Sequence, residues 1–244
     1  MFIQSLALFS LYLHAVVDAA PTTGGILSDT LALVSSSTEL SQLKVTGCSL
    51  KDISPPLNET SVSLSGPETN GTLAYVALGR GTQNYTCADN SSSSVPTATG
   101  AVATMFDASC LAGDVDLLAD LTMAIAKLPH DATVLAGLSL KQLTASSESL
   151  VLAEHFFSDS TTPKFDFRPF DHSQWVQTKK LESVDAPSTA MPGSVKWLKL
   201  GYKDGVGIHQ VYRTLTAGGN APATCEGQQP DIEVQYAAAY YFYS

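Results

Sequence analysis

Apolar and polar residues alternate in short runs along most of the chain. From position 45 onward, runs rich in Val, Leu, Tyr, Phe and Thr are separated by Gly, Pro, Ser, Asn and Asp. This spacing predicts an all-β domain, an antiparallel sandwich or a partly closed barrel. We expect strands at 43–50, 61–64, 72–78, 83–88, 101–107, 133–143, 150–157, 164–167, 194–202, 209–216 and 233–243, with 177–184 as one further candidate.

One segment departs from this rhythm and follows a helical repeat instead. Apolar side chains recur at the spacing of one helix face between Leu118 and Leu128. Asp114 stands at the start, Lys127 near the end and Pro129 just beyond it. These charges complement a helix dipole, and proline stops propagation, so the pattern predicts one inserted amphipathic helix at about 114–128.

The first residues have the features of a secretory signal peptide. Residues 1–19 are mostly apolar, and the small side chains of Val17 and Ala19 precede a plausible cleavage point. The apolar stretch is too short and too interrupted for a membrane span. We therefore expect an extracellular protein, with cell-wall association left open. Residues 20–44 would form a leader and cover segment, and residues 45–244 a single β-rich domain.

Two further features agree with export. Four glycosylation sequons begin at Asn58, Asn70, Asn84 and Asn90. Strand alternation favours an outward Asn84, although the opposite orientation stays open. The chain also has four cysteines without a CxxC motif, and their even number predicts two disulfides with three possible connectivities.

Composition excludes some partners. The 244 residues are enough for a substantial core, but only 15% are charged, and the formal net charge is −10. An acidic chain with 13 basic residues offers little cationic surface for phosphates, which speaks against nucleic-acid binding. Oligomeric state is not encoded in any pattern we identify.

Candidate catalytic residues are few, and no G-x-S-x-G or H-E-x-x-H motif is present. His155 shares a strand face with apolar neighbours, which suits either a core histidine or a general base. Asp107 could cap a turn or line a cleft. Asp107, Glu154 and Asp166 could supply a carboxylate pair, but their spacing does not bring them together. A metal site of Asp107, His155 and Asp166 is equally unsupported, so we predict no metal and no cofactor.

Aromatic residues are the other candidates for binding. Rings can stack on sugars or flat apolar ligands, and they can equally pack within a sheet. The candidates are Trp197, Tyr212, Tyr236 and Tyr240. The leading hypothesis is a non-catalytic binding or cell-surface protein for polysaccharide or a small apolar ligand. The alternative is a secreted carboxylate-dependent hydrolase, with metal assistance left open.

Several strings together resemble a known family. They are ALGRGTQNYTC at 77–87, GAVATMFDASC at 100–110, VYRTLTAGG at 211–219 and VQYAAAYYFY at 234–243. The chain resembles secreted fungal members of a family known as domain of unknown function thirty-four fifty-five. The resemblance implies secretion and a β-rich domain, and it supplies no catalytic residues. Because Cys87 closes one string and Cys225 follows another, it also implies the pairs Cys87–Cys225 and Cys48–Cys110.

Members of that family often carry the label malate dehydrogenase, which can be tested against the residues. A dinucleotide-binding turn needs G-x-G-x-x-G before a helix. Here Gly79 and Gly81 are followed by a strand-like run without the third glycine. We expect these glycines to make a bulge or bend between strands, and we do not expect a nicotinamide-dependent dehydrogenase.

Overall fold

The computed structural model describes residues 48–68, 70–143 and 149–244. The expected signal peptide at 1–19 and the whole leader and cover segment at 20–44 lie outside these residues. Of the strand expected at 43–50, only 48–50 is described, and it is irregular. The strand expected at 61–64 is also wrong: these residues form bends and coil, with Leu64 buried as part of an irregular cover.

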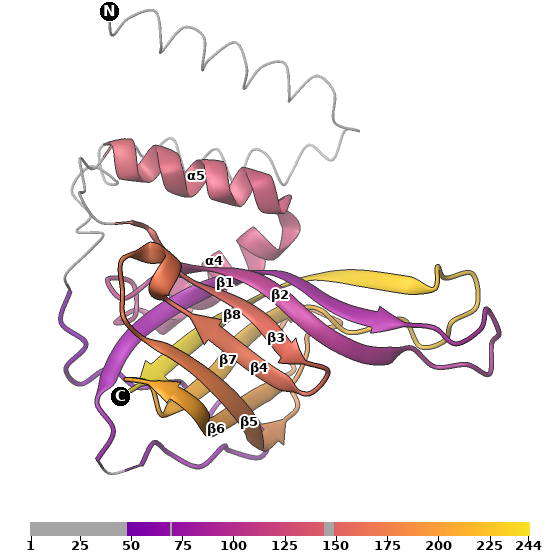
Figure 1. Ribbon diagram of the computed structural model, residues 1–244, viewed down its shortest axis with the longest axis horizontal. Coiled ribbons are helices and arrows are strands. Elements are labelled where there is room, and N and C mark those ends of the chain that lie inside the picture. Colours follow the sequence, from indigo (N-terminus) through magenta and orange to yellow (C-terminus); the bar gives the residue numbers. More distant parts are fainter. Residues whose placement is uncertain (1–47, 69, 144–148) are drawn as a thin grey trace, which may run out of the picture. The chain divides into compact units, whose positions relative to one another are not determined.

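Eight antiparallel strands close into a barrel in which each strand pairs with the next and the last pairs with the first (Figure 1). This confirms the predicted all-β class and resolves it to a barrel. The strands are β1 (Leu73–Thr86), β2 (Thr97–Asp107), β3 (Val151–Asp159), β4 (Thr162–Asp166), β5 (Trp175–Val184), β6 (Trp197–Val206), β7 (Gln210–Gly218) and β8 (Asp231–Tyr243), with a short 3-10 turn, η1 (Arg168–Phe170), after β4.

The predicted helix is present as α4 (Val115–Lys127). The Asp114 side chain caps it by accepting a hydrogen bond from the Leu117 backbone N–H at 3.0 Å. The helix packs against β8, β7 and β1. The prediction of a strand at 133–143 is wrong, because these residues belong to a second helix, α5 (His130–Leu143). Its apolar residues are spread around the helix, so no clear helical stripe marks it in the sequence.

Apolar side chains fill two separate layers. The barrel interior is occupied by rings and small residues, including Met105, Phe165, Tyr240 and Phe242. A second layer lies between the outer face of β7, β8 and β1 and the covering elements; it includes Leu64, Leu118, Trp197, Tyr212 and Tyr241. The strand β8 serves both layers, because its alternating side chains point in opposite directions.

Gly79 and Gly81, in the string at 77–87, were expected to make a bulge or bend between strands, and the structure shows a different role. Gly79 and Gly81 do not break the strand, since β1 runs through both of them. A Cβ at Gly79 would lie 2.6 Å from the Tyr240 ring, and one at Gly81 would lie 1.8 Å from the Val102 carbonyl oxygen. The glycines therefore permit close approach of neighbouring strands and side chains.

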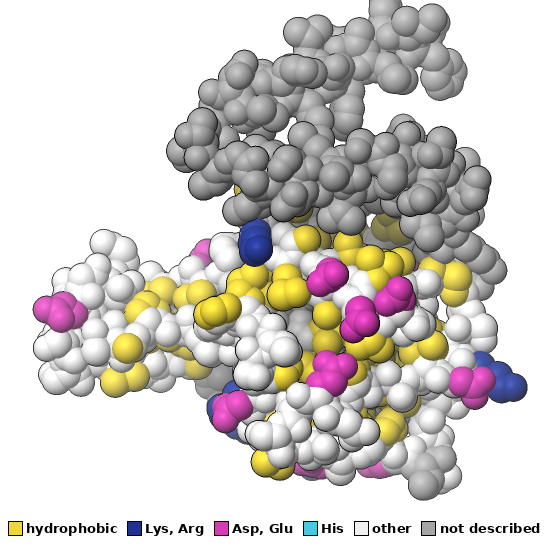
Figure 2. Space-filling view, turned by 180° about the vertical axis from the view of Figure 1, so that it is seen from behind, with side chains coloured by type: hydrophobic (Ala, Val, Ile, Leu, Met, Phe, Trp, Pro, Cys, Tyr) yellow, Lys and Arg dark blue, Asp and Glu magenta, His cyan; other side chains and the backbone are white. Residues whose placement is uncertain are grey.

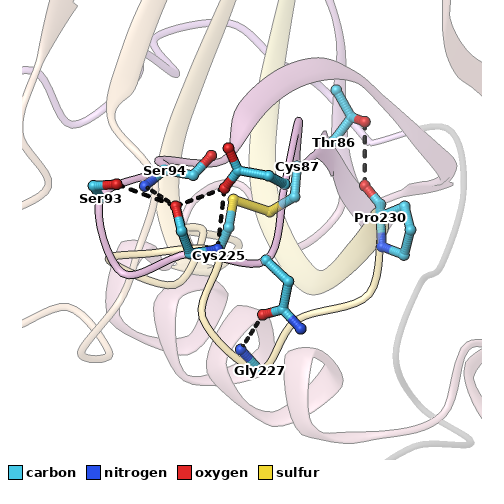
Figure 3. The surroundings of a disulfide bond; sticks show 10 residues. Thr86, Cys87, Ser93, Ser94, Cys225, Gly227 and Pro230 are labelled. Carbon is cyan, nitrogen blue, oxygen red and sulfur yellow. Dashed lines mark hydrogen bonds between the residues drawn. A yellow bond between two sulfur atoms is a disulfide. The ribbon is translucent and has the colours of Figure 1, made fainter.

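Both disulfides have the implied pairing, Cys48–Cys110 and Cys87–Cys225. The second joins the segment after β1 to the segment before β8 (Figure 3). Backbone hydrogen bonds flank it: the Cys87 N–H donates to the Pro230 carbonyl at 2.7 Å, and the Cys225 N–H donates to the Ser94 carbonyl at 2.8 Å. This network fixes one end of the β1–β2–β8 sheet.

Candidate functional site

A groove of about 540 Å³ lies on the outer face of the barrel, across β8, β1, β2 and β3. It forms where β2 and β3 diverge, because their ladder ends at the pair Ala103–His155 while β2 continues along β1 to Thr97. The first residue of α5, His130, closes one side. The lining residues are Gly81, Thr82, Val102, Ala103, Thr104, His130, Glu154, His155, Phe156, Glu233 and Gln235.

The groove combines polar side chains with the apolar side chains of Val102, Ala103 and Phe156. Val102 is 54% exposed, and Phe156 is half-buried beside it on the next strand. Thr104 and His130 are joined by a hydrogen bond of 3.0 Å between the hydroxyl oxygen and Nε2. Lysine and arginine do not occur among the lining residues. Acidic side chains also outnumber basic ones on the face shown in Figure 2, in keeping with the net charge of −10.

The two groove carboxylates belong to distant strands. Glu154 is on β3 and Glu233 on β8, with β2 and β1 between them. Three interstrand spacings separate them by about 14 Å, before any offset along the strands. Glycosidase carboxylates lie about 5–10 Å apart, so this pair does not have the separation that glycoside hydrolysis needs.

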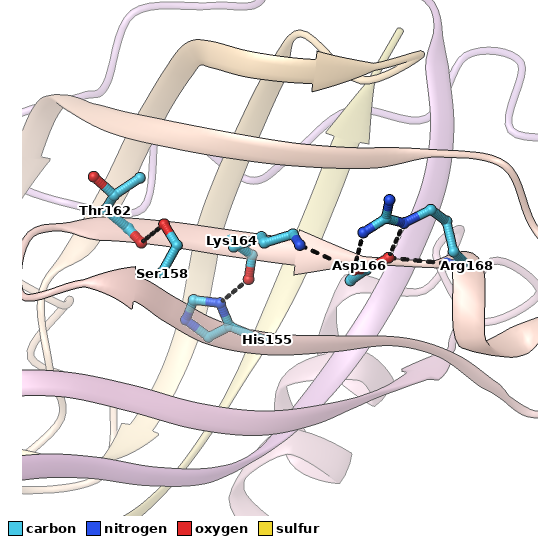
Figure 4. A network of polar contacts seen from close by, with 6 residues as sticks. All are labelled: His155, Ser158, Thr162, Lys164, Asp166 and Arg168. Atoms are coloured by element: carbon cyan, nitrogen blue, oxygen red, sulfur yellow. Dashed lines mark hydrogen bonds and ion pairs between the residues drawn. The ribbon is translucent and has the colours of Figure 1, made fainter.

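A different carboxylate stands directly opposite Glu154. The β3–β4 register pairs Glu154 with Asp166, a proximity that sequence spacing did not reveal. Asp166 is bound by Arg168 through two hydrogen bonds, 2.8 Å from Nε and 2.6 Å from Nη2, and by Lys164 at 3.1 Å (Figure 4). These cations hold the pKa of Asp166 well below its usual range. We call Lys164, Asp166 and Arg168 the closed cluster.

His155 lies on the opposite face of β3 from Glu154, toward the barrel interior. It is 3% exposed and stacks on Phe165 with ring centroids 4.3 Å apart. Its Nδ1–H donates to the Lys164 carbonyl at 2.9 Å, which leaves Nε2 as a hydrogen-bond acceptor (Figure 4). Burial lowers the pKa of His155 to about 4, so the ring is neutral over most of the pH range.

Asp107 takes the turn-capping role. Its carboxylate accepts a hydrogen bond from the Ser109 backbone N–H at 2.9 Å, just after β2. Of the three residues considered for a metal site, Asp107 caps a turn, His155 packs in the barrel interior and Asp166 belongs to the closed cluster. Within the part of the chain that the structure describes, no group of three or more His, Cys, Asp or Glu is arranged to hold a metal ion.

A family model described as "Protein of unknown function (DUF3455)" matches residues 67–244. The chain belongs to the DUF3455 family. The match extends over all eight strands, both described helices and the whole groove, and it confirms the resemblance found in the sequence. No curated protein and no solved structure matches the chain. None of the described helices has the length and apolar character needed to cross a membrane.

In this DUF3455 member, the aromatic residues considered for binding are buried. Trp197 and Tyr240 are each 1% exposed, and Tyr212 and Tyr236 are fully buried. The Tyr236 and Tyr240 hydroxyls hydrogen-bond to each other at 3.0 Å within the barrel. Trp197 and Tyr212 pack in the outer layer that α4 covers. The expectation of a ligand surface at these four rings is therefore corrected: they form core.

The four glycosylation sequons of the chain differ in accessibility. Asn58, Asn70 and Asn90 are exposed, and the Asn90 side-chain oxygen accepts a hydrogen bond from the Gly227 N–H at 2.5 Å. Asn84 is half-buried, and its side-chain oxygen is enclosed without a hydrogen-bond partner. It follows Thr82 on the outer face of β1, while the Tyr85 hydroxyl, on the other face, donates to the Gly219 carbonyl.

Most groove residues are not identified as candidate site residues by the sequence of this chain. Of the candidates chosen there, Glu154 and His155 line the groove, and Asp107 and Asp166 do not. The residues that were missed come from four strands and a helix start, and only strand register brings them together. They are Gly81, Thr82, Val102, Ala103, Thr104, His130, Phe156, Glu233 and Gln235.

Proposed function

We propose that the protein is exported and binds a polysaccharide in the outer groove without catalysing a reaction. The observation that carries this proposal is the lining, in which carboxylate, amide and hydroxyl groups surround the apolar side chains of Val102 and Phe156. Sugar rings present hydroxyls at their edges and C–H groups on their faces. A binding surface for them therefore needs polar groups placed around an apolar platform.

Export is supported by two kinds of observation. Both disulfides require an oxidising compartment to form and persist. The apolar segment at 1–19 and the exposed sequon asparagines Asn58, Asn70 and Asn90 agree with passage through a secretory pathway. An extracellular polysaccharide binder would meet its ligand at or near a cell wall.

A small apolar ligand is less well supported. Such a ligand would suit the barrel interior, but the interior is occupied by side chains such as Phe165, Tyr236 and Phe242, all fully buried. The outer groove, with carboxylates on two sides, would leave those charges poorly solvated beneath an apolar molecule. The carboxylate, amide and hydroxyl groups of the lining favour a ligand that carries hydrogen-bonding groups beside its apolar faces.

Sedimentation with insoluble polysaccharides tests the proposal directly. The secreted protein is mixed with chitin, chitosan, cellulose and β-glucan, and the bound fraction is measured. We expect binding to at least one polymer and about a tenfold loss of affinity in Phe156→Ala. Tyr202→Ala removes an exposed ring outside the groove and is the matched control. Failure of the wild-type protein to bind any polymer, or equal losses in both variants, would overturn the proposal.

A carboxylate-dependent hydrolase is the second candidate, favoured by the Glu154–Asp166 pairing across β3 and β4. Directly opposed residues have Cβ atoms about 5 Å apart, which would let the two carboxyl groups reach the separation used by retaining glycosidases. However, Asp166 is already occupied by Arg168 and Lys164, so neither oxygen is left for a sugar. We expect no release of reducing ends from the bound polymer; release that Glu154→Gln abolishes would establish the hydrolase instead.

A further inference from the structure

We infer that the polysaccharide bound by the groove carries free ammonium groups, as a de-N-acetylated amino-sugar polymer does. This inference rests on the proposed function and narrows its ligand class. It depends on three features of the lining: prominent hydrogen-bond acceptors, two separated carboxylates, and cations that are engaged elsewhere.

Hydrogen-bond acceptors are prominent among the polar groups of the lining. Glu154 and Glu233 contribute carboxylates, and neither has a hydrogen bond or an ion pair among the residues that the structure describes. The Thr82 hydroxyl and the Gln235 side-chain oxygen line the groove as well and can also accept hydrogen bonds. A ligand that satisfies these groups must be rich in donors.

The neighbouring cations do not neutralise these carboxylates. Lys164 and Arg168 both bind Asp166 in the closed cluster. Arg80, beside Gly81 on β1, is 1% exposed and donates to the backbone carbonyls of Ile125 and Leu128 under the end of α4. The groove thus keeps two carboxylates whose charge is available to a ligand.

An ammonium group fits this chemistry better than an acetamide or a carboxylate. It supplies three donors and a positive charge, whereas an acetamide N–H supplies one donor without a charge. A carboxylate-bearing polymer would be repelled by both glutamates. Glu154 and Glu233 are separated by about 14 Å across the strands and are also offset along them, because Glu154 aligns with Arg80 and Glu233 with Asn84 on β1. A polymer with repeated ammonium groups can contact both carboxylates at once, which a single small cation cannot do.

The decisive experiment compares two ligands that differ only in acetylation. Soluble oligosaccharides of glucosamine and of N-acetylglucosamine, matched in length, are titrated calorimetrically into the protein in mildly acidic buffer. We expect the glucosamine oligomer to bind about tenfold more tightly. Glu154→Gln and Glu233→Gln should each weaken its binding several-fold and should weaken binding of the acetylated oligomer by a smaller factor, because Gln keeps a hydrogen-bonding group and removes the charge. Glu226→Gln, an exposed carboxylate outside the groove, should have no effect.

The outcomes separate this inference from the proposed function. Equal affinity for the two oligomers, or preference for the acetylated one, with Phe156→Ala still weakening binding, would overturn the ammonium inference alone. Loss of binding in Glu226→Gln as large as in the groove variants would also overturn it, because attraction to an acidic protein surface would then suffice. Absence of binding to both oligomers and to every insoluble polymer would overturn the proposed function as well.

Discussion

Two sets of charged side chains lie next to each other on the outer face of the barrel, and they differ in how their charges are satisfied. In the closed cluster, Asp166 is bound on both oxygens by Arg168 and Lys164. Across the strand pair, Glu154 faces the groove without an ion pair in the described chain. Neighbouring carboxylates on one sheet can thus serve different ends, one stabilising the fold and the other left for a partner.

The cations of the closed cluster also contact aromatic rings. Lys164 lies 5.2 Å from the ring centroids of Phe156 and Trp175, and Arg168 lies 5.2 Å from that of Trp175. The cations of the closed cluster are therefore held by rings as well as by Asp166. Phe156 belongs to both regions, because the same side chain also lines the groove.

The largest expected effect comes from breaking the closed cluster. Asp166 has a side chain 11% exposed, and its removal leaves Lys164 at 16% exposure without its anion. We expect Asp166→Asn to lower the free energy of unfolding by about 3 kcal/mol. Glu154→Gln, directly opposite, should cost less than about 0.5 kcal/mol. Urea denaturation of both variants measures the two losses of unfolding free energy. Similar losses would show that Asp166 and Glu154 contribute equally to stability and would contradict the comparison.

The next effect concerns His155, which hydrogen-bonds the backbone of the closed cluster. Its pKa is lowered from 6.5 to about 4 in the folded protein, so the unfolded chain binds the proton more readily. Stability is fully present above pH 6.5 and falls by about 2 to 3 kcal/mol as the pH approaches 4. His155→Gln keeps a donor for the Lys164 carbonyl and cannot titrate, so its stability should change less over this window.

The exposed His209→Gln is the control for that measurement, and it should keep the pH dependence of the wild-type protein. Chemical denaturation at several pH values between about 4 and 6.5 measures the free energy of unfolding of each variant. A wild-type-like slope in His155→Gln would assign the pH dependence to other groups. Asp166 does not contribute in this window, because its lowered pKa places its loss of stability below the ordinary carboxyl value of 3.8.

The third prediction concerns a positive charge introduced into the groove by substitution. Val102→Lys places a cation beside Thr82 and Thr104, and we expect about a tenfold loss of affinity for ammonium-bearing oligosaccharides. Stability should change little, since Val102 is 54% exposed. Val95→Lys makes the same substitution at a position 67% exposed outside the groove, and its affinity should equal that of the wild-type protein.

The smallest expected effect is a response to salt. Exposed charges separated by more than about 10 Å are largely screened at 0.1 M ionic strength, while short, partly buried ion pairs are screened much less. Binding of glucosamine oligomers should therefore weaken about threefold between low and moderate salt. The stability difference between wild type and Asp166→Asn should stay nearly constant. Calorimetry and denaturation at matched salt concentrations test both halves of this expectation.

The β class and the helix at 114–128 could be predicted because each depends on a local pattern. Leu118 and Leu128 mark one helical face, and Asp114 and Pro129 delimit it. The helix α5 was mistaken for a strand because Thr133 and neighbouring apolar residues have strand propensity and lack a clear helical stripe. No local apolar pattern therefore distinguishes this helix from a strand in the sequence.

The site could be predicted only in part, for a related reason. Alternation correctly separated Glu154 from His155 on β3, but it could not show which residues lie opposite them. The meeting of Glu154 with Asp166 depends on the β3–β4 register, and the inclusion of Glu233 depends on closure of the barrel between β8 and β1. Burial of Tyr236 likewise follows from closure, which converts one face of a strand into an interior.

The two tryptophans of the chain have consequences for spectroscopy. Trp197 is 1% exposed in the layer beneath α4, whereas Trp175 is half-buried on β5 against the cations of the closed cluster. The native emission spectrum should therefore be the sum of a blue-shifted component that aqueous quenchers do not reach and a red-shifted component that they do. Trp175→Phe would isolate the first as a reporter of global unfolding, and Trp197→Phe would isolate the second as a reporter of local rearrangement beside the groove.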